Sequence, residues 1–274
     1  MQDMRCLAVL ALAFALAGCS PAPEAPTELS DLSRYILAEF DSDDPRVLEG
    51  ALANLADVFA ATDLEGDLRD ERTFIPDKLT AEDLAGIETP PDTDPADLVP
   101  VAVVGRSRHP VANHMAFQRQ PDQLPAEPSA ETYERTYLAP DDPSCFGVED
   151  DCTLLRTQNA IRRVNALMRV DFVLFKDFRL VDVDPDAGLQ GLAARSWLTE
   201  SWDGESGGTR LIQSYTEDIF IDLPDGGSLR YQMLQTETDL GPDVADSLVQ
   251  AIVRGSIDSS FGAADDAIDE LLEL

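Results

Sequence analysis

The chain has 274 residues, of which 53 are Asp or Glu and only 20 are Lys or Arg, so its formal net charge is −33. This charge repels nucleic acid and anionic lipid headgroups, and it excludes both as partners held by electrostatic attraction. The length allows one or two domains with a hydrophobic core. Only Lys78 and Lys176 are lysines, and this composition is consistent with a saline habitat or with a GC-rich genome.

The first 19 residues have the pattern of a secretion signal. Arg5 precedes an almost wholly apolar run, residues 6–17, which is too short to span a bilayer. The run Leu16-Ala17-Gly18-Cys19 resembles the bacterial lipoprotein consensus, the lipobox, at all four positions. The alternative is an ordinary signal peptide that leaves Cys19 as a plain thiol.

The lipobox resemblance implies that residues 1–18 are a cleaved signal peptide and that Cys19 carries diacylglycerol and an amide-linked acyl chain such as palmitate. Two or three acyl chains anchor a protein stably in a membrane. The partner implied is therefore the cell-envelope membrane, bound through the lipid on Cys19. In such lipoproteins Ser20 after the cysteine favours the outer membrane.

The remaining cysteines are Cys145 and Cys152, since Cys6 leaves with the signal peptide. In an oxidising envelope compartment we expect them to form a disulfide, which the chain-entropy model values at roughly 2.5 kcal/mol for so short a loop. A metal pair is the less favoured interpretation, because both histidines lie well upstream.

The first part of the mature chain has helical and Pro-rich segments. Residues 19–28 are a Pro-rich tether, and residues 29–65 have the apolar spacing of a helical hairpin. Asp44 and Pro45 are the N-cap and first turn of its second helix. Residues 66–100 are expected to be an acidic, Pro-rich linker with one short helix near residues 80–85.

Residues 101–274 are expected to form an antiparallel sheet followed by a C-terminal helix. The predicted strands are residues 101–104, 133–138, 153–165, 167–183, 192–202, 209–223 and 228–239. From Met168 to Leu180 apolar and charged residues alternate, with Lys176 as the exception on the apolar face. Turns are predicted at residues 203–208 and 224–227.

The C-terminal region is expected to form two helices. The first starts at Pro242 and is amphipathic, and the second is a short acidic helix over residues 263–273. The first helix is expected to present one apolar face formed by Val244, Leu248, Ala251, Ile252 and Gly255.

Long antiparallel strands, the Gly241-Pro242 junction and a final amphipathic helix together resemble the helix-grip architecture of the START-like lipid-transfer superfamily over residues 130–262. The fold class expected is therefore α+β, with a helical hairpin before a curved antiparallel sheet that is closed by the C-terminal helix. The resemblance implies a cavity for an apolar ligand between sheet and helix. A packed domain without a cavity is the alternative.

Three segments could carry chemistry. The run Gly204–Gly208 matches the hydrolase elbow Gly-x-Ser-x-Gly, but we interpret it as a hairpin turn because no histidine follows it. The acidic segment 182–186, with Asp182, Asp184 and Asp186, is a weak candidate for binding a cation.

The third segment holds His109 and His114, the only histidines, preceded by Arg106 and Arg108. Two histidines five residues apart lack the third ligand that zinc requires. Ligand or anion binding by these four residues is the more favoured prediction.

The leading interpretation is a non-enzymatic envelope lipoprotein that binds an apolar small molecule or an envelope protein, with no catalytic residues, no metal, no cofactor and no nucleic acid. The alternative is an envelope hydrolase or metal-dependent enzyme that uses His109, His114 and nearby carboxylates.

Overall fold

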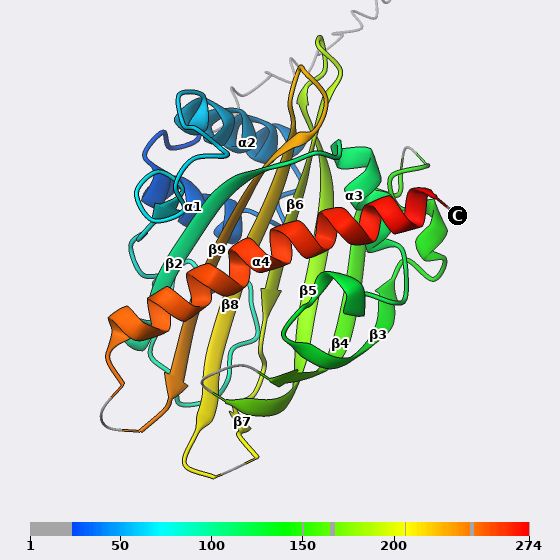
Figure 1. Cartoon of the computed structure of the whole chain (residues 1–274). Coiled ribbons are helices and arrows are strands. Elements are labelled where there is room, and N and C mark those ends of the chain that lie inside the picture. Colours follow the sequence, from blue (N-terminus) through cyan, green and yellow to red (C-terminus); the bar gives the residue numbers. More distant parts are fainter. Residues whose placement is uncertain (1–23, 150, 165–167, 206, 242–243, 274) are drawn as a thin grey trace, which may run out of the picture.

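The computed structural model describes residues 24–149, 151–164, 168–205, 207–241 and 244–273. The predicted signal peptide, the lipobox and Ser20 lie outside these residues. The described chain forms one antiparallel sheet in the order β1-β2-β9-β8-β6-β5-β4-β3, and β7 pairs separately with β8 (Figure 1). The expected fold class, an antiparallel sheet with a C-terminal helix across it, is confirmed.

The strands vary from two-residue edges to a sixteen-residue ribbon. Their bounds are β1 Thr73–Phe74, β2 Val99–Ser107, β3 Ala130–Ala139, β4 Leu154–Val164, β5 Arg169–Asp184, β6 Leu189–Trp197, β7 Trp202–Asp203, β8 Arg210–Asp222 and β9 Ser228–Asp239. The helices are α1 Leu29–Ala38, α2 Pro45–Phe59, α3 Val111–Gln118 and α4 Asp246–Leu272. Single 3₁₀ turns occur at Pro95–Asp97, Leu124–Ala126 and Pro143–Cys145.

Helices cover both faces of the sheet. The apolar stripes of α1 and α2 pack on one face, where their leucines contact Ile219 of β8 and Tyr231 and Met233 of β9. The hydroxyl groups of Ser33 and Tyr231 are 2.7 Å apart across this interface. Helix α4 crosses the other face obliquely, and α3 lies beside its C-terminal half (Figure 1). Because side chains alternate between faces along a strand, neighbouring residues of β8 and β9 enter two different interiors.

The two helices predicted at the N-terminus are present, and Asp44 caps α2 by accepting a hydrogen bond from the Arg46 amide. Residues 79–98 lie against the same face of the sheet as α1 and α2, whereas Leu68 and Arg72 contact α4 on the other face. Residues 66–100 contribute β1 and the buried side chains of Leu79, Leu84, Ile87 and Leu98. The chain around Thr80 forms turns capped by Asp83 rather than the short helix expected there.

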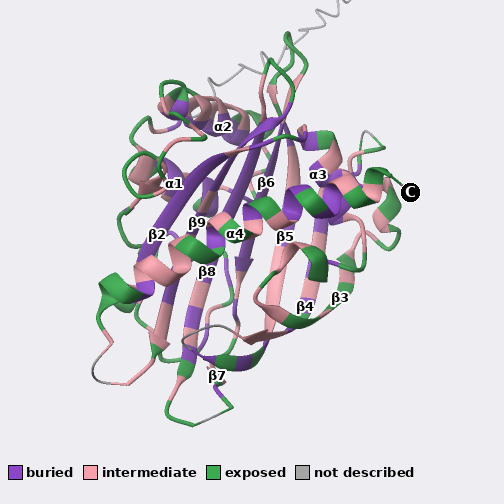
Figure 2. Ribbon diagram, viewed as in Figure 1, coloured by how far each residue is buried: buried purple, intermediate pink, exposed green. Residues whose placement is uncertain are grey.

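The C-terminal region differs from the prediction. A single helix, α4, runs through Gly255 and Gly262, so the separate helix expected over residues 263–273 was wrong. Its buried face is also one position away from the predicted one, since Val249 is buried and Leu248 is 49% exposed. Figure 2 shows buried and exposed turns alternating along α4. The first turns of α4 carry two overlapping apolar stripes. The packing of Ile257 and Phe261 against the sheet fixes which of the two stripes faces it.

The turn predicted at residues 224–227 is present. Gly226 and Gly227 have φ of 83° and 102° in the turn that joins β8 to β9. A Cβ atom on Gly227 would lie 2.6 Å from the carbonyl oxygen of Ser107, so this turn also fits against the end of β2. The predicted disulfide between Cys145 and Cys152 is present, next to the buried ring of Phe146.

One carboxyl group is buried in the interface between the sheet and the α1–α2 pair. Glu217 of β8 is 1% exposed, and neither of its carboxyl oxygens has a hydrogen-bond partner among the described residues. Burial raises its pKa well above the ordinary value of a glutamate, so the folded protein keeps this group protonated and neutral.

We expect Glu217→Gln to stabilise the protein increasingly as the pH rises from 5 to 8. The unfolded chain releases the Glu217 proton above its ordinary pKa while the folded chain retains it, so wild-type stability falls with rising pH through this group. A glutamine cannot ionise, so the variant does not lose stability through this side chain as the pH rises. Urea unfolding at both pH values measures the difference, and exposed Glu134→Gln is the control. An equal gain at both values would contradict the expectation.

Candidate functional site

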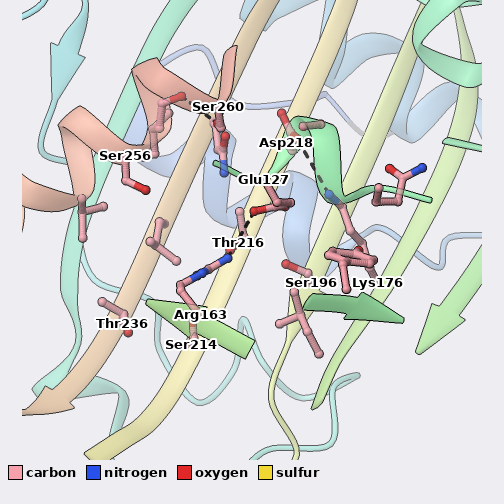
Figure 3. A pocket seen from close by; sticks show the side chains of 18 of the residues that line it. Glu127, Arg163, Lys176, Ser196, Ser214, Thr216, Asp218, Thr236, Ser256 and Ser260 are labelled. Carbon is pink, nitrogen blue, oxygen red and sulfur yellow. Dashed lines mark hydrogen bonds and ion pairs between the residues drawn. The ribbon is translucent and has the colours of Figure 1, made fainter. Parts of the chain in front are cut away.

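A cavity lies between α4 and the sheet face beneath it (Figure 3). Its volume is about 160 Å³, several times the ~30 Å³ that one water molecule occupies in the liquid. The sequence resemblance implied a cavity at this place, and the alternative of a filled interface is therefore wrong.

Small side chains on both sides create this space. On the sheet, Ser196 of β6, Ser214 and Thr216 of β8 and Thr236 of β9 point toward α4, and Ser256 and Ser260 line the cavity from α4. These positions recur every second residue on the strands and about every fourth on the helix, which keeps them on facing surfaces. On the opposite face of the same strands, the larger side chains of Tyr215, Ile219 and Tyr231 are fully buried.

Much of the cavity wall is apolar. The apolar lining residues are Phe117, Met168, Val170, Phe172, Leu174, Leu198, Leu211, Phe220, Leu234, Val249, Ile252, Val253 and Ile257. Val170, Phe172 and Leu174 are the alternating face of β5 that the sequence predicted to be apolar. They contact Leu198, Leu211 and partly buried neighbours as one cluster at one end of the cavity. An apolar wall with a few convergent polar groups is typical of small-molecule sites.

The polar groups of the cavity centre on Asp218 of β8. The Nε and Nη2 atoms of Arg230 each donate a hydrogen bond of 3.1 Å to its two carboxylate oxygens. The Lys176 ammonium lies 4.0 Å from Oδ2 of the same carboxylate (Figure 3). The Arg230 guanidinium also stacks between the rings of Phe220 and Phe261, 4.8 and 4.2 Å from their centroids. Two cations therefore converge on one buried carboxylate.

A second ion pair lines the cavity. Arg163 of β4 lies 3.4 Å from the carboxylate of Glu127, and its guanidinium stands 5.2 Å from the ring centroid of Phe172. This pair joins the loop before β3 to the sheet.

Lys176 is the functional candidate that the sequence analysis did not propose. The signal was present, because Lys176 was the one charged residue on the apolar face of its strand. Burial lowers the pKa of Lys176, and the nearby Asp218 carboxylate opposes that shift only in part. A desolvated ammonium costs stability unless it is paired, which makes Lys176 a candidate for contact with a ligand.

The predicted histidine segment clamps α4 to the sheet. The Arg108 guanidinium contacts the carboxylates of Asp265, Asp266 and Asp269. His109 is 6% exposed, and its Nε2 lies 3.2 Å from Asp269. Arg106 is separate from this cluster, pairing with Asp225 in the β8–β9 turn. The structure thus brings Arg108 and His109 together on the acidic face of α4.

His114 alone of the four predicted residues lines the cavity. It is 1% exposed, with its ring 4.2 Å from that of Phe220. Its burial, with the charge of Arg230, lowers the pKa of the imidazole well below the ordinary value, so it is neutral at pH 7. This leaves His114 as a hydrogen-bonding group rather than a cation.

A serine, a histidine and an aspartate do meet here, but in an order different from that of a hydrolase. Ser107 Oγ lies 2.5 Å from Asp265 Oδ1 and 2.9 Å from His114 Nε2, so the serine stands between the other two groups. In a catalytic triad the histidine stands in the middle. The Ser107 hydroxyl also accepts from the His109 amide and is 2% exposed. Its hydrogen-bonding capacity is used up in holding β2, α3 and α4 together.

We expect Asp265→Ala to loosen α4 from the sheet. The change leaves the Ser107 hydroxyl and the Arg108 amide without their buried acceptor, which costs about 1–3 kcal/mol. Asp266→Ala is the matched control, because Asp266 is 77% exposed and its ion pair is worth about 0–1 kcal/mol. Hydrogen exchange of the α4 amides should accelerate in the first variant only. Equal protection in both would show that Ser107 and Asp265 do not hold the helix.

The other two candidate segments lie away from the cavity. Asp182 and Asp184 are on β5 where it turns into β6, and among the described residues no three His, Cys, Asp or Glu side chains gather as metal ligands. The run Gly204–Gly208 lies in the turn from β7 to β8, where the Gly204 amide bonds the Thr209 carbonyl; Ser206 is outside the described residues. The prediction of a hairpin turn is confirmed for Gly204, Gly207 and Gly208.

Helix α4 is the longest described helix at 27 residues, yet neither it nor the other helices of the described chain combine the length and hydropathy needed to cross a bilayer.

No protein-family model matches the chain, and no curated protein matches its sequence. Among solved structures, the human StAR-related lipid transfer protein 5 is 10% identical, with 63% of this chain and 76% of that chain covered and a TM-score of 0.40. A STAR-related lipid transfer protein from Xanthomonas axonopodis is 11% identical, covering 62% and 85% at a TM-score of 0.40. A START superfamily protein from Mycobacterium smegmatis is also 11% identical, covering 63% and 98% at 0.39. At these scores the likeness assigns neither family nor function.

Proposed function

We propose that this protein is a lipid-anchored protein of the cell envelope that binds an apolar small molecule between its sheet and α4. The observation that supports the proposal is the cavity itself. One face of the sheet is filled by aromatic and aliphatic side chains, whereas the other leaves about 160 Å³ open beneath a helix. Where the wall of the cavity is apolar, an unfilled gap forfeits packing energy, and an apolar ligand would recover those contacts.

The anchor is proposed from the lipobox at Leu16–Cys19, and Ser20 points to the outer membrane. An acyl anchor gives the protein a membrane affinity that electrostatics cannot provide, because a net charge of −33 is repelled by anionic headgroups. Location and binding then fit together, since an apolar ligand is most abundant next to a membrane.

We expect Cys19→Ser to abolish acylation and to release the protein from the envelope membrane. A hydroxyl cannot form the thioether through which the lipid is attached. Incorporation of radiolabelled palmitate and membrane fractionation measure the two effects. Cys6→Ser is the control, because Cys6 lies within the segment that is removed. Retention of label in the Cys19 variant would contradict the proposed anchor.

We expect Ser260→Trp to abolish ligand binding without unfolding the protein. Ser260 lines the cavity from α4, and an indole at this position would project into the open volume. Ser259→Trp is the matched control on the same helical turn, because Ser259 is exposed on the outer side of α4. Native mass spectrometry of the protein extracted from the envelope should show a bound ligand in wild type and Ser259→Trp, and not in Ser260→Trp. Identical bound mass in both variants would place the ligand elsewhere.

A further inference from the structure

The charge of the cavity is opposite to that of the protein. Five charged side chains line it, of which Arg163, Lys176 and Arg230 are cationic and Glu127 and Asp218 are anionic. Three cations less two carboxylates leave a net charge of +1, inside a chain whose net charge is −33. His114 adds no charge because it is neutral.

The excess charge can be assigned to one residue. Glu127 is matched by Arg163 at 3.4 Å, and Asp218 is matched by the two-pronged hydrogen bond of Arg230. Lys176 shares that same Asp218 at 4.0 Å, which is longer than a hydrogen bond. The third cation therefore has no carboxylate of its own in the cavity.

One donor atom of the Arg230 guanidinium has no hydrogen-bond partner among the described residues. Its Nε and Nη2 atoms bind Asp218, while its Nη1 atom is buried without a hydrogen-bond partner among the described residues. The residue is 6% exposed and lines the cavity. Leaving a buried, charged N–H unpaired is costly, so the positive charge beside Asp218 is only partly compensated by hydrogen bonds.

Resting on the proposed function, we propose that the ligand is a single-chain amphiphile with an acidic head group, a carboxylate, which binds the Lys176 ammonium. The head supplies the missing negative charge and an acceptor, and it needs no donor. A neutral head would leave Lys176 unmatched, and a cationic head would add a further unmatched charge. The chain would then follow the apolar face of β5 through Leu174, Phe172 and Val170.

The cavity volume, about 160 Å³, favours one acyl chain over two. Laurate, a twelve-carbon chain with one carboxylate, is a suitable probe for this class of ligand.

The test compares twelve-carbon amphiphiles that differ in the head group only. Laurate, dodecanol and dodecyltrimethylammonium each compete with the neutral fluorophore N-phenyl-1-naphthylamine for the full-length protein at pH 8. We expect laurate to bind at least tenfold more tightly than dodecanol, and dodecyltrimethylammonium to bind most weakly. Lys176→Met should remove the preference for laurate while changing dodecanol affinity less than threefold, and Lys176→Arg should retain part of that preference.

Lys78→Met is the matched control, since Lys78 is the only other lysine. Lys78 is exposed and does not line the cavity. Lys176→Met is expected to fold, because methionine has a similar length and Asp218 keeps both hydrogen bonds to Arg230. Should it fail to fold, acetylation of the wild type by acetic anhydride replaces it: laurate must protect Lys176 and leave Lys78 reactive.

The outcomes separate the two proposals. Binding of laurate and dodecanol with equal affinity to the wild type would overturn the acidic head group and leave apolar ligand binding intact. Binding of neither, together with failure of the fluorophore to bind, would overturn both. A laurate preference that survives in Lys176→Met would show that another group recognises the carboxylate.

Discussion

The structure depends on the alternation of side chains across a single sheet that is covered on both faces. Along β8, Tyr215, Glu217 and Ile219 point into the interior shared with α1 and α2, while Thr216 and Asp218 point toward α4. One interior is filled by large side chains, and the other is left open by small ones. Strand register therefore sets the cavity: a shift by one residue would exchange the two linings and remove it.

Much of this architecture could be predicted from the sequence, because its signals are local. The last strand of the sheet begins at Ser228 and ends at Asp239, as the sequence predicted, since Gly227 and Asp239-Leu-Gly define its ends. The face of α4 could not be predicted, because Leu248 and Val249 start two equally apolar stripes and only tertiary contact selects between them. The same limit applies to the site. Lys176 was visible as an exception to the pattern of its strand. The residues around it, Asp218 and Arg230, lie 42 and 54 positions further along the chain, so the sequence alone could not place them beside it.

The ion pairs show how an acidic protein uses its few cations. Arg108 holds α4 through three aspartates, and Arg195, itself 4% exposed, joins Asp177 of the sheet to Asp41 between α1 and α2. These two arginines thus each neutralise part of the negative charge of the acidic segment that they bind. Around Asp218 the cations outnumber the carboxylates, and both Lys176 and Arg230 line the cavity.

The entry of the chain into the domain has a consequence for where the protein can work. Asn54 of α2 donates hydrogen bonds to the carbonyls of Ala25 and Pro26, so the fold begins almost at the start of the described chain. Under the proposed acylation of Cys19, only five residue steps separate the lipid from Glu24, a reach of at most about 18 Å. So short a tether keeps the α1–α2 side of the fold near the membrane surface. A ligand-binding protein held in this way would exchange its ligand with the membrane that carries its anchor, and delivery to a distant membrane would need a second carrier.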